Sequence, residues 1–332
     1  MKARTIATAA AAAVLLACGV GGARPAPVRV GVVLNALDNP FWVAMYEGVR
    51  AEATRRGVRA SVRAPATSYD LAGQAARARA LVAGRNDCYA IAPISATNLV
   101  IALRGVRRPL VVVNSPIDLV AAKRAGLRIR TYIGSSDVGA GKLAGTEMAS
   151  LLHGTGDVAL LGGWADNINS KLRLGGFERG IHGTNVKVVA RANADYVRVK
   201  AEVAAARILR THPHLSGFFA ANDLMALGVA DAVRSAGKTA DIRIIGLDGI
   251  TEALDAIRDG SMSATVSQYP YAMGQMAVEA CLAAARGARL PARADAPVAL
   301  VNAANVSRAS AVFPRPFGGY SDPFARILRN RP

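Results

Sequence analysis

The chain has 332 residues, 52% of them hydrophobic and 19% charged, and its 41 basic against 23 acidic residues give a formal net charge of +18. This length exceeds one compact core, so we expect two lobes. Because the basic residues are spread along the chain and no helix-turn-helix, RNA-binding aromatic motif or zinc spacing occurs, the charge does not indicate nucleic-acid binding.

The first segment in chain order has the layout of an export signal. A short basic start precedes an apolar run at residues 6–17, which is too short to span a bilayer. The run ends in "LLAC", which is similar to a bacterial lipobox, so we expect a signal peptide at residues 1–18 and lipidation of Cys18. Ordinary secretion, with cleavage near Ala17 or between Ala23 and Ala26, is the alternative. We expect residues 19–27 to form a flexible tether, and the protein to be exported to the periplasm or cell envelope and anchored to a membrane by the lipid.

The next segment predicts a strand followed by a helix. Residues 28–34, "VRVGVVL", are apolar and β-branched, as a strand buried on both faces requires. Asn39 can cap the first turn of the helix and Pro40 suits its first position. Phe41 and Trp42 then lie in the first turn, beside the end of the strand, where they would line a crevice.

Strand and helix patterns alternate as far as residue 301. Repeated units of this kind predict an α/β fold with parallel sheets covered by helices on both faces, and their number favours two doubly wound lobes. Helical patterns include residues 40–57 and 196–212. Further strands are expected at residues 59–64, 88–92, 110–113, 130–133, 157–161, 186–191, 217–220, 242–246, 263–267 and 298–301.

Polar side chains follow several of these strands. Because the carboxyl ends of parallel strands face the ligand crevice of an open α/β sheet, these groups should gather at one edge. Taken singly, each has a structural explanation, such as a helix cap or a turn. Polar groups at five strand ends favour a binding crevice instead. They are Asn35, the pair Asn114 and Ser115, Asn222, Asp248 and Gln268.

The motifs exclude several chemistries. Neither G-x-G-x-x-G nor G-x-x-x-x-G-K-[ST] occurs, so no nucleotide cofactor is expected, and no G-x-S-x-G indicates a hydrolase. The four histidines do not follow strands, and no metal site is expected. Aromatic faces with amide and carboxylate groups suit a neutral polyol, because the rings cover C–H patches and the polar groups bind hydroxyls. We therefore expect a binding protein and not an enzyme.

Two cysteines remain beyond the export signal. Cys88 lies at the start of an apolar strand, and Cys281 lies in an Ala-rich helix. We expect both to be buried free thiols. The sequence does not decide whether they form a disulfide instead, since export leads to an oxidising compartment where disulfides form.

Four segments together carry a family resemblance: "DNPFWVAMYEGVRAEATRRG", "FFAANDLMALGVADAVRSAGK", "IIGLDGI" and "ATVSQYPYAMGQMAVEA". They resemble the ribose-binding and related sugar-binding proteins of bacterial ABC importers, which are type I periplasmic binding proteins akin to the ligand domain of LacI-type repressors. The resemblance runs from about Val28 to Val306. It implies two lobes joined by a three-strand hinge, with a sugar or related polyol held between them. It also implies that the protein delivers the sugar to an ABC permease in the inner membrane. We expect it to be a monomer.

The resemblance also implies a division of the chain. The first lobe comprises residues 28–136 and 269–299, and the second comprises residues 137–268 and 300–312. The tail at residues 313–332 extends past the resemblance, as a disordered appendage or as a clasp across the lobes.

Individual residues match the family's binding positions. If Arg173 and Tyr196 do not bind the ligand, the alternatives are an exposed charge on a helix for Arg173 and a core residue at the start of a helix for Tyr196. The resemblance implies a guanidinium at Arg173, aromatic faces at Phe41, Trp42 and Tyr196, and hydrogen-bonding groups at Asn39, Asn222, Asp248 and Gln268.

Two positions depart from the ribose pattern. Asn114 and Ser115 stand where ribose binders have an Asp-Arg pair, and Ala92 replaces an Asn. Losing those charge-assisted contacts makes ribose itself a poorer match. A receptor subunit that senses a sugar-like signal is the alternative function. A LacI-type transcription factor would need a DNA-binding headpiece, whereas residues 1–27 have signal character.

Overall fold

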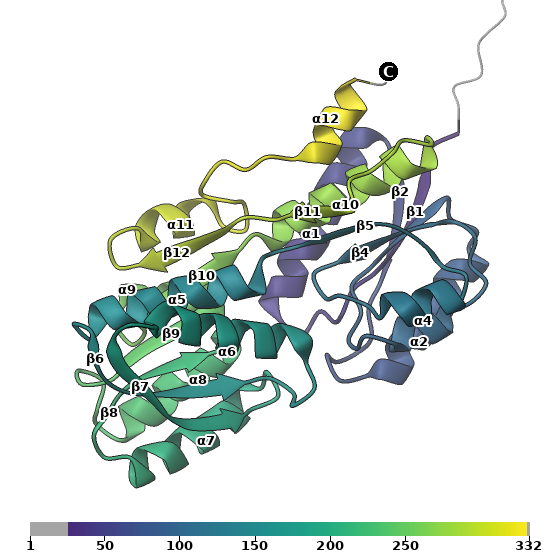
Figure 1. Cartoon of the computed structure of the whole chain (residues 1–332). Helices are drawn as coiled ribbons and strands as arrows, with labels where there is room; N and C mark the ends of the chain where they lie inside the picture. The colour runs from purple at the N-terminus through teal and green to yellow at the C-terminus, as the bar shows by residue number, and fades with distance from the viewer. Residues whose placement is uncertain (1–25, 331–332) are drawn as a thin grey trace, which may run out of the picture.

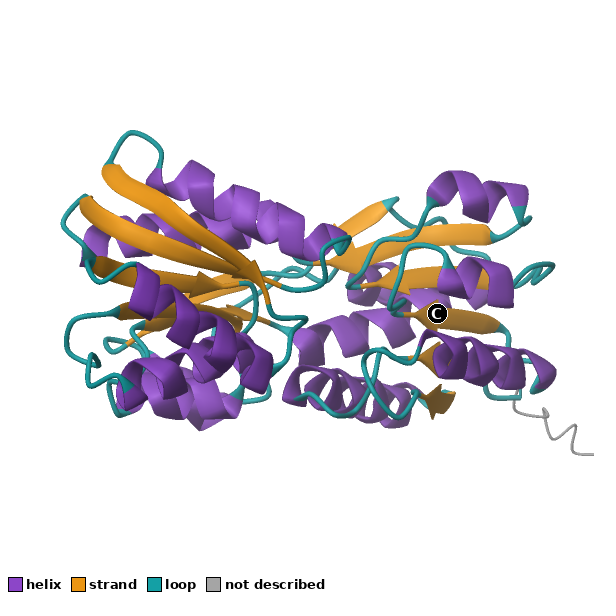
Figure 2. Cartoon of the chain, turned by 90° about the horizontal axis from the view of Figure 1, so that it is seen from below, coloured by secondary structure: helices purple, strands orange, loops and turns teal. Residues whose placement is uncertain are grey.

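The strands of the chain sort into two six-stranded sheets, each covered by helices on both faces (Figures 1 and 2). The computed structural model describes residues 26–330. The predicted signal peptide, its Cys18 and most of the tether lie outside these residues. None of the helices within the described part is long and apolar enough to cross a membrane.

The first lobe holds the sheet with strand order β11-β5-β4-β3-β1-β2. Helices α1 and α10 pack together on one face, and α2, α3 and α4 lie on the other. The strands are β1 (Arg29–Val33), β2 (Arg59–Arg63), β3 (Cys88–Ile91), β4 (Pro109–Val113), β5 (Arg128–Gly134) and β11 (Arg293–Asp295). The helices are α1 (Pro40–Arg56), α2 (Leu71–Ala83), α3 (Asn98–Ala102), α4 (Leu119–Arg124), α10 (Pro270–Ala285) and, farther along the chain, α12 (Pro323–Arg329).

The second lobe repeats this arrangement with strand order β12-β10-β9-β8-β6-β7. Helices α5 and α6 cover one face, and α7, α8 and α9 cover the other. The strands are β6 (Thr155–Gly162), β7 (Asn185–Asn193), β8 (Leu215–Ala220), β9 (Arg243–Asp248), β10 (Ala264–Gln268) and β12 (Val298–Asn302). The helices are α5 (Asp137–Leu151), α6 (Ile168–Ile181), α7 (Arg198–Thr211), α8 (Asp223–Ser235), α9 (Thr251–Arg258) and α11 (Val306–Val312).

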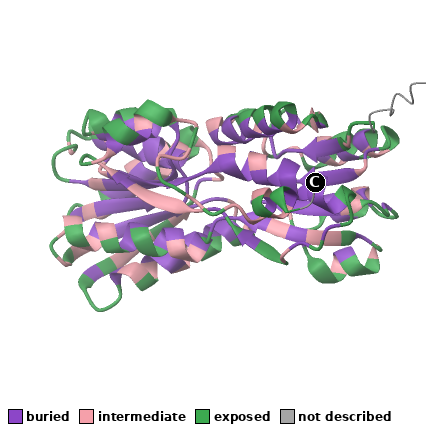
Figure 3. Ribbon diagram, turned by 90° about the horizontal axis from the view of Figure 1, so that it is seen from above, coloured by how far each residue is buried: buried purple, intermediate pink, exposed green. Residues whose placement is uncertain are grey.

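Three connections join the two sheets: β5 to α5, β10 to α10, and β11 to β12. All strand pairs are parallel among the described residues except β10 with β12. The predicted α/β class with two doubly wound lobes is therefore confirmed. The interiors of both sheets are buried, while the outer helix faces are exposed (Figure 3).

Two details at the third connection differ from expectation. Strand β11 is absent from the expected strands, because its three residues are mostly polar and exposed. All of β12 pairs with β10, so the expected boundary at residue 299 cuts a strand of the second sheet. Because β12 belongs to the second sheet, the boundary between the lobes lies in the connection before Val298.

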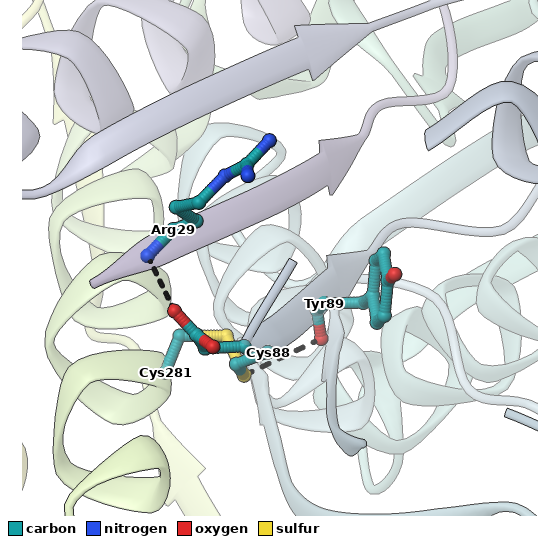
Figure 4. The surroundings of a disulfide bond; sticks show 5 residues. Arg29, Cys88, Tyr89 and Cys281 are labelled. Atoms are coloured by element: carbon teal, nitrogen blue, oxygen red, sulfur yellow. Dashed lines mark hydrogen bonds between the residues drawn. A yellow bond between two sulfur atoms is a disulfide. The ribbon is translucent and has the colours of Figure 1, made fainter. Parts of the chain in front are cut away.

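The two remaining cysteines form a disulfide, so the expected free thiols are wrong (Figure 4). Helix α10 returns through the second connection and packs beside β3. This brings the Cα atoms of Cys88 and Cys281 to 5.4 Å, within the range that a disulfide requires. Both residues are fully buried, so the bond fastens α10 to the sheet inside the first lobe.

Candidate functional site

A cavity lies between the lobes, where the carboxyl ends of strands from both sheets meet. The cavity volume is about 70 Å³, so the lobes leave little free space between them in this structure. Ten of the eleven predicted site residues line it, and the eleventh, Gln268, donates a hydrogen bond of 2.8 Å to Asp248 Oδ1. The lining residues are Asn35, Asn39, Phe41, Trp42, Ser68, Asn114, Ser115, Trp164, Asn169, Arg173, Tyr196, Asn222 and Asp248.

The first helix supplies the aromatic wall. Asn39 caps α1 through its Oδ1, which accepts a 2.9 Å hydrogen bond from the backbone N–H of Phe41, and Pro40 occupies the first helical position as predicted. This cap fixes Phe41 and Trp42 in the first turn, with their rings edge to face at 4.9 Å. Both side chains are buried yet border the cavity, so they offer apolar faces to whatever occupies it.

A buried arginine lies on the wall of the second lobe. Arg173 Nε donates to Asp137 Oδ1 at 2.7 Å and its Nη1 donates to the Ala221 carbonyl at 2.8 Å. Only 5% of the residue is exposed, which excludes the alternative of an exposed helical charge. Burial alone would lower the pKa of Arg173, but the carboxylates of Asp137 and Asp248 outweigh it and hold the pKa above its ordinary value. The guanidinium is therefore a fixed positive charge.

Asp248 is held in an unusual backbone conformation at the end of β9. Its φ is 140°, a region that side chains other than glycine avoid at a cost of about 1–3 kcal/mol. The buried Asp223 holds the turn, since its Oδ2 accepts from the N–H groups of Gly249 and Ile250 at 2.6 and 3.0 Å. Burial raises the pKa of Asp248 to about 8, and the charge of Arg173, 3.8 Å away, offsets only part of this rise.

Three residues that line the cavity have a positive backbone φ. Besides Asp248, Asn114 and Tyr196 have positive φ values of 62° and 63°. Such conformations persist only where the surrounding structure enforces them, and they are concentrated at functional sites. Tyr196 is further fixed because its hydroxyl donates a 2.8 Å hydrogen bond to Asn167 Oδ1. Its side chain therefore does not serve core packing alone.

Three lining residues are missing from the sequence-based set: Ser68, Trp164 and Asn169. Trp164 lies edge to face with Tyr196 at 5.3 Å and with Tyr69 of the first lobe at 5.8 Å. The rings of Tyr69, Trp164 and Tyr196 therefore form one aromatic cluster that joins the two lobes.

Asn169 joins the lobes directly. Its Nδ2 donates to Asp137 Oδ2 at 2.8 Å within the second lobe and to the Asn114 carbonyl of the first lobe at 3.3 Å. The structure is thus a closed form, in which the two walls of the cavity touch.

Two buried acceptors at the cavity lack donors. Among the described residues, Asn35 Oδ1 and Asn169 Oδ1 have no hydrogen-bond partner although both are buried. They come from opposite lobes and line the same cavity. An unpaired buried acceptor costs about 1–3 kcal/mol, so the pair points to a bound molecule with hydrogen-bond donors.

The donor set does not resemble a metal centre. Within residues 26–330 no three His, Cys, Asp or Glu side chains come together as possible metal ligands. The cavity instead offers amides, one guanidinium and one carboxyl group between aromatic rings, which is an inventory for hydrogen bonding and stacking.

Comparisons with known proteins show the family of the chain. The family model for the periplasmic binding protein domain matches residues 30–289. The D-allose-binding periplasmic protein of Escherichia coli K12 is 34% identical, over 75% of this chain and 82% of that protein. The ribose import binding protein RbsB of Bacillus subtilis is 30% identical, over 82% of this chain and 86% of that protein.

Solved structures share the fold. An ABC transporter solute-binding protein from Actinobacillus succinogenes with bound D-allose superposes with a TM-score of 0.80, at 24% identity, over 84% of this chain and 99% of that chain. A solute-binding protein from Mycobacterium smegmatis with bound glycerol gives a TM-score of 0.77 at 26% identity, over 89% of this chain and all of the other.

Proposed function

This chain belongs to the periplasmic binding protein family, and from that premise we propose that it binds a neutral sugar or related polyol between its lobes and delivers it to an ABC permease. One observation carries the proposal: Asn35 and Asn169 line one aromatic-walled cavity from opposite lobes, and the Oδ1 atom of each is buried without a hydrogen-bond partner among the described residues. Sugar hydroxyls are donors that satisfy such acceptors, and a molecule that reaches both would hold the lobes together.

The charges of the cavity favour a neutral ligand. Arg173, the guanidinium in the wall, is already paired with Asp137. A further carboxyl group, that of Asp248, adjoins it at 3.8 Å. No positive charge is left over to hold a phosphate or carboxylate, because the acidic groups already match the single arginine. Polyols need no counter-charge, and their hydroxyls can both donate to Asp248 and accept from Arg173.

The relatives suggest which polyols to examine. Their names indicate D-allose and ribose, and a structural neighbour holds glycerol. Asn114 and Ser115 line the cavity, and the resemblance implies an Asp-Arg pair at these positions in ribose binders, so we propose a monosaccharide other than ribose. The eleven predicted site residues are proposed to contact it directly or, for Gln268, through Asp248.

Exposed apolar side chains next to the cavity support delivery to a membrane partner. Tyr69 and Leu71 of the first lobe border one groove together with Ile168 of the second. Leu119 and Leu172, again from opposite lobes, border a neighbouring groove. Only the closed form brings these halves together, so a permease that binds across them would select the loaded protein.

The remaining parts of the proposal concern the chain outside the cavity. We propose that the protein acts as a monomer without enzymatic activity, so that the sugar is released chemically unchanged. We also propose that Cys18 carries a lipid that keeps the protein at a membrane. This residue lies outside the described part of the chain.

A thermal-shift screen tests the function. The probes are D-allose, D-ribose, myo-inositol and glycerol, with a charged sugar phosphate and a free amino acid as controls. A sugar at a hundred times its dissociation constant should add about 2.7 kcal/mol of stability. Calorimetry then gives the affinity of each hit. Stabilisation by the charged compounds alone would contradict the proposal.

A further inference from the structure

The C-terminal segment crosses from the second lobe to the first (Figure 1). At its start, α11 packs against α9 of the second lobe, with Val306 and Ala309 buried. Arg258 of α9 donates to Ser310 Oγ at 2.8 Å. This end of the segment therefore moves with the second lobe.

The other end is docked on the first lobe. Helix α12 packs against α10, and its Phe324 has no exposed surface. Asp322 caps the helix by accepting from the N–H groups of Phe324 and Ala325 at 2.8 and 3.0 Å. The preceding Tyr320 donates to Gln275 Oε1 of α10 at 3.3 Å. The alternative of a disordered appendage is thus excluded for this helix.

A buried cluster of charges lies beside this dock. Glu279 of α10 is 1% exposed, and its Oε1 accepts from Arg55 and Arg56 of α1. Its Oε2 has no hydrogen-bond partner among the described residues, and the carboxyl group of Asp322 lies near the Glu279 side chain. Burial, with the neighbouring Asp322 and Glu52 carboxyl groups, raises the pKa of Glu279 to about 9.

Between the two docks, the segment touches a hinge connection. The ring of Phe317 lies edge to face with that of Tyr269 at 6.0 Å, and Arg308 of α11 covers Phe317 at 5.5 Å. Tyr269 lies between β10 and α10, directly after Gln268, which donates to Asp248 at the cavity. The crossing segment therefore contacts the chain that links the site to the hinge.

We propose that residues 313–322, here called the strap, form a fourth connection between the lobes that stabilises the closed form and so raises the affinity for sugar. This inference rests on the proposed function. Opening the lobes would move α11 away from α12, so the strap would have to stretch or release Phe317. Because the contacts at both docks and at Phe317 are made together in the closed form, the strap shifts the equilibrium towards closure.

Lengthening the strap is the direct test. A six-residue Gly-Ser insertion between Gly318 and Gly319, both exposed, adds about 20 Å of slack and leaves both docks intact. The matched control is the same insertion between the exposed Thr239 and Ala240, in the turn after α8. Phe317→Ala provides a second variant that keeps the chain length and removes the contact with Tyr269.

Two measurements decide the outcome. Small-angle scattering without sugar should give a larger radius of gyration for the lengthened strap than for the control insertion. D-allose binding by calorimetry should weaken about fivefold or more, since a smaller closed fraction lowers the apparent affinity. Phe317→Ala should change both readouts in the same direction.

The two proposals fail separately. Unchanged scattering curves for both strap variants would overturn the strap, whatever D-allose does. If the wild-type protein binds none of the screened sugars, the proposed function is contradicted, and the scattering comparison still decides whether the strap holds the lobes.

Discussion

Asp248 combines strain, burial and charge in one residue, and this makes it the energetic centre of the proposed site. We expect Asp248→Ala to weaken sugar binding by about 1.5–3 kcal/mol, because a charge-assisted hydrogen bond is lost. This corresponds to roughly a tenfold to 150-fold loss of affinity. Calorimetry above pH 8 measures it, with Asp255→Ala on the exposed face of α9 as the matched control. Equal affinities for both folded variants would place the site elsewhere.

The same residue predicts a pH dependence. Burial raises the pKa of Asp248 to about 8 in the closed form, and hydroxyl donors from a sugar would lower it. The bound form then favours the carboxylate, so binding at neutral pH must release a proton. Affinity should rise with pH and level off above about 8, by at most tenfold per pH unit. Calorimetry in buffers of different ionisation enthalpy detects the released proton, and Asp248→Asn should abolish the effect. A wild-type affinity that falls as pH rises would have the wrong sign.

Residue roles were predictable where a strand end and a familiar motif coincide. Asn35 and Asn222 lie two residues past the ends of their strands and Asp248 is the last residue of β9, and the structure places all three at the cavity. Trp164 and Asn169 had the same kind of signal, since they lie after β6 and in the first turn of α6. These positions correspond to Asn35 and Phe41 in the first lobe. The likeness of the two lobes, visible only once the sheets are paired, is what makes this correspondence clear.

At the scale of elements, the disulfide explains how a distant helix is kept in the first lobe. Cys88 and Cys281 are 193 positions apart in the sequence, so the bond removes much conformational entropy from the unfolded chain. We expect the double variant Cys88→Ser, Cys281→Ser to lose about 2–4 kcal/mol of unfolding free energy. Urea unfolding measures this, and dithiothreitol should lower the wild type to the level of the variant without affecting the variant. Insensitivity of the wild-type midpoint to complete reduction would contradict the prediction.

Element boundaries followed closely from local patterns, and long-range pairing did not. The strand at residues 28–34 and the Asn39 cap are visible in the sequence because burial and capping each leave a local signal. The pairing of Cys88 with Cys281 depends on α10 returning to β3, which no local signal encodes. The short, polar β11 lacks any pattern of burial, and for that reason it was missed.

At the scale of the whole molecule, function depends on how strongly the closed form is favoured. The two sheets have equivalent strand orders, and residues at the carboxyl ends of strands from both sheets line one cavity. Contacts across the cavity must stay weak enough for the empty protein to open, since a strong bond would exclude the sugar. The Asn169 to Asn114 hydrogen bond, at 3.3 Å, is long and neutral, as such a balance requires.

Asn169 and Asn35 form a matched pair for measuring that balance. Each offers one unpaired acceptor to the cavity, but only Asn169 also bonds across to the other lobe. Asn35→Ala and Asn169→Ala should therefore both weaken sugar binding, by about 1 kcal/mol or more for the lost hydrogen bond. Without sugar, only Asn169→Ala should enlarge the radius of gyration in small-angle scattering, because only it removes an interlobe contact. Adding saturating sugar should return the two variants to the same compact form. An equal expansion of both, or of neither, would mean that the interlobe bond does not influence closure.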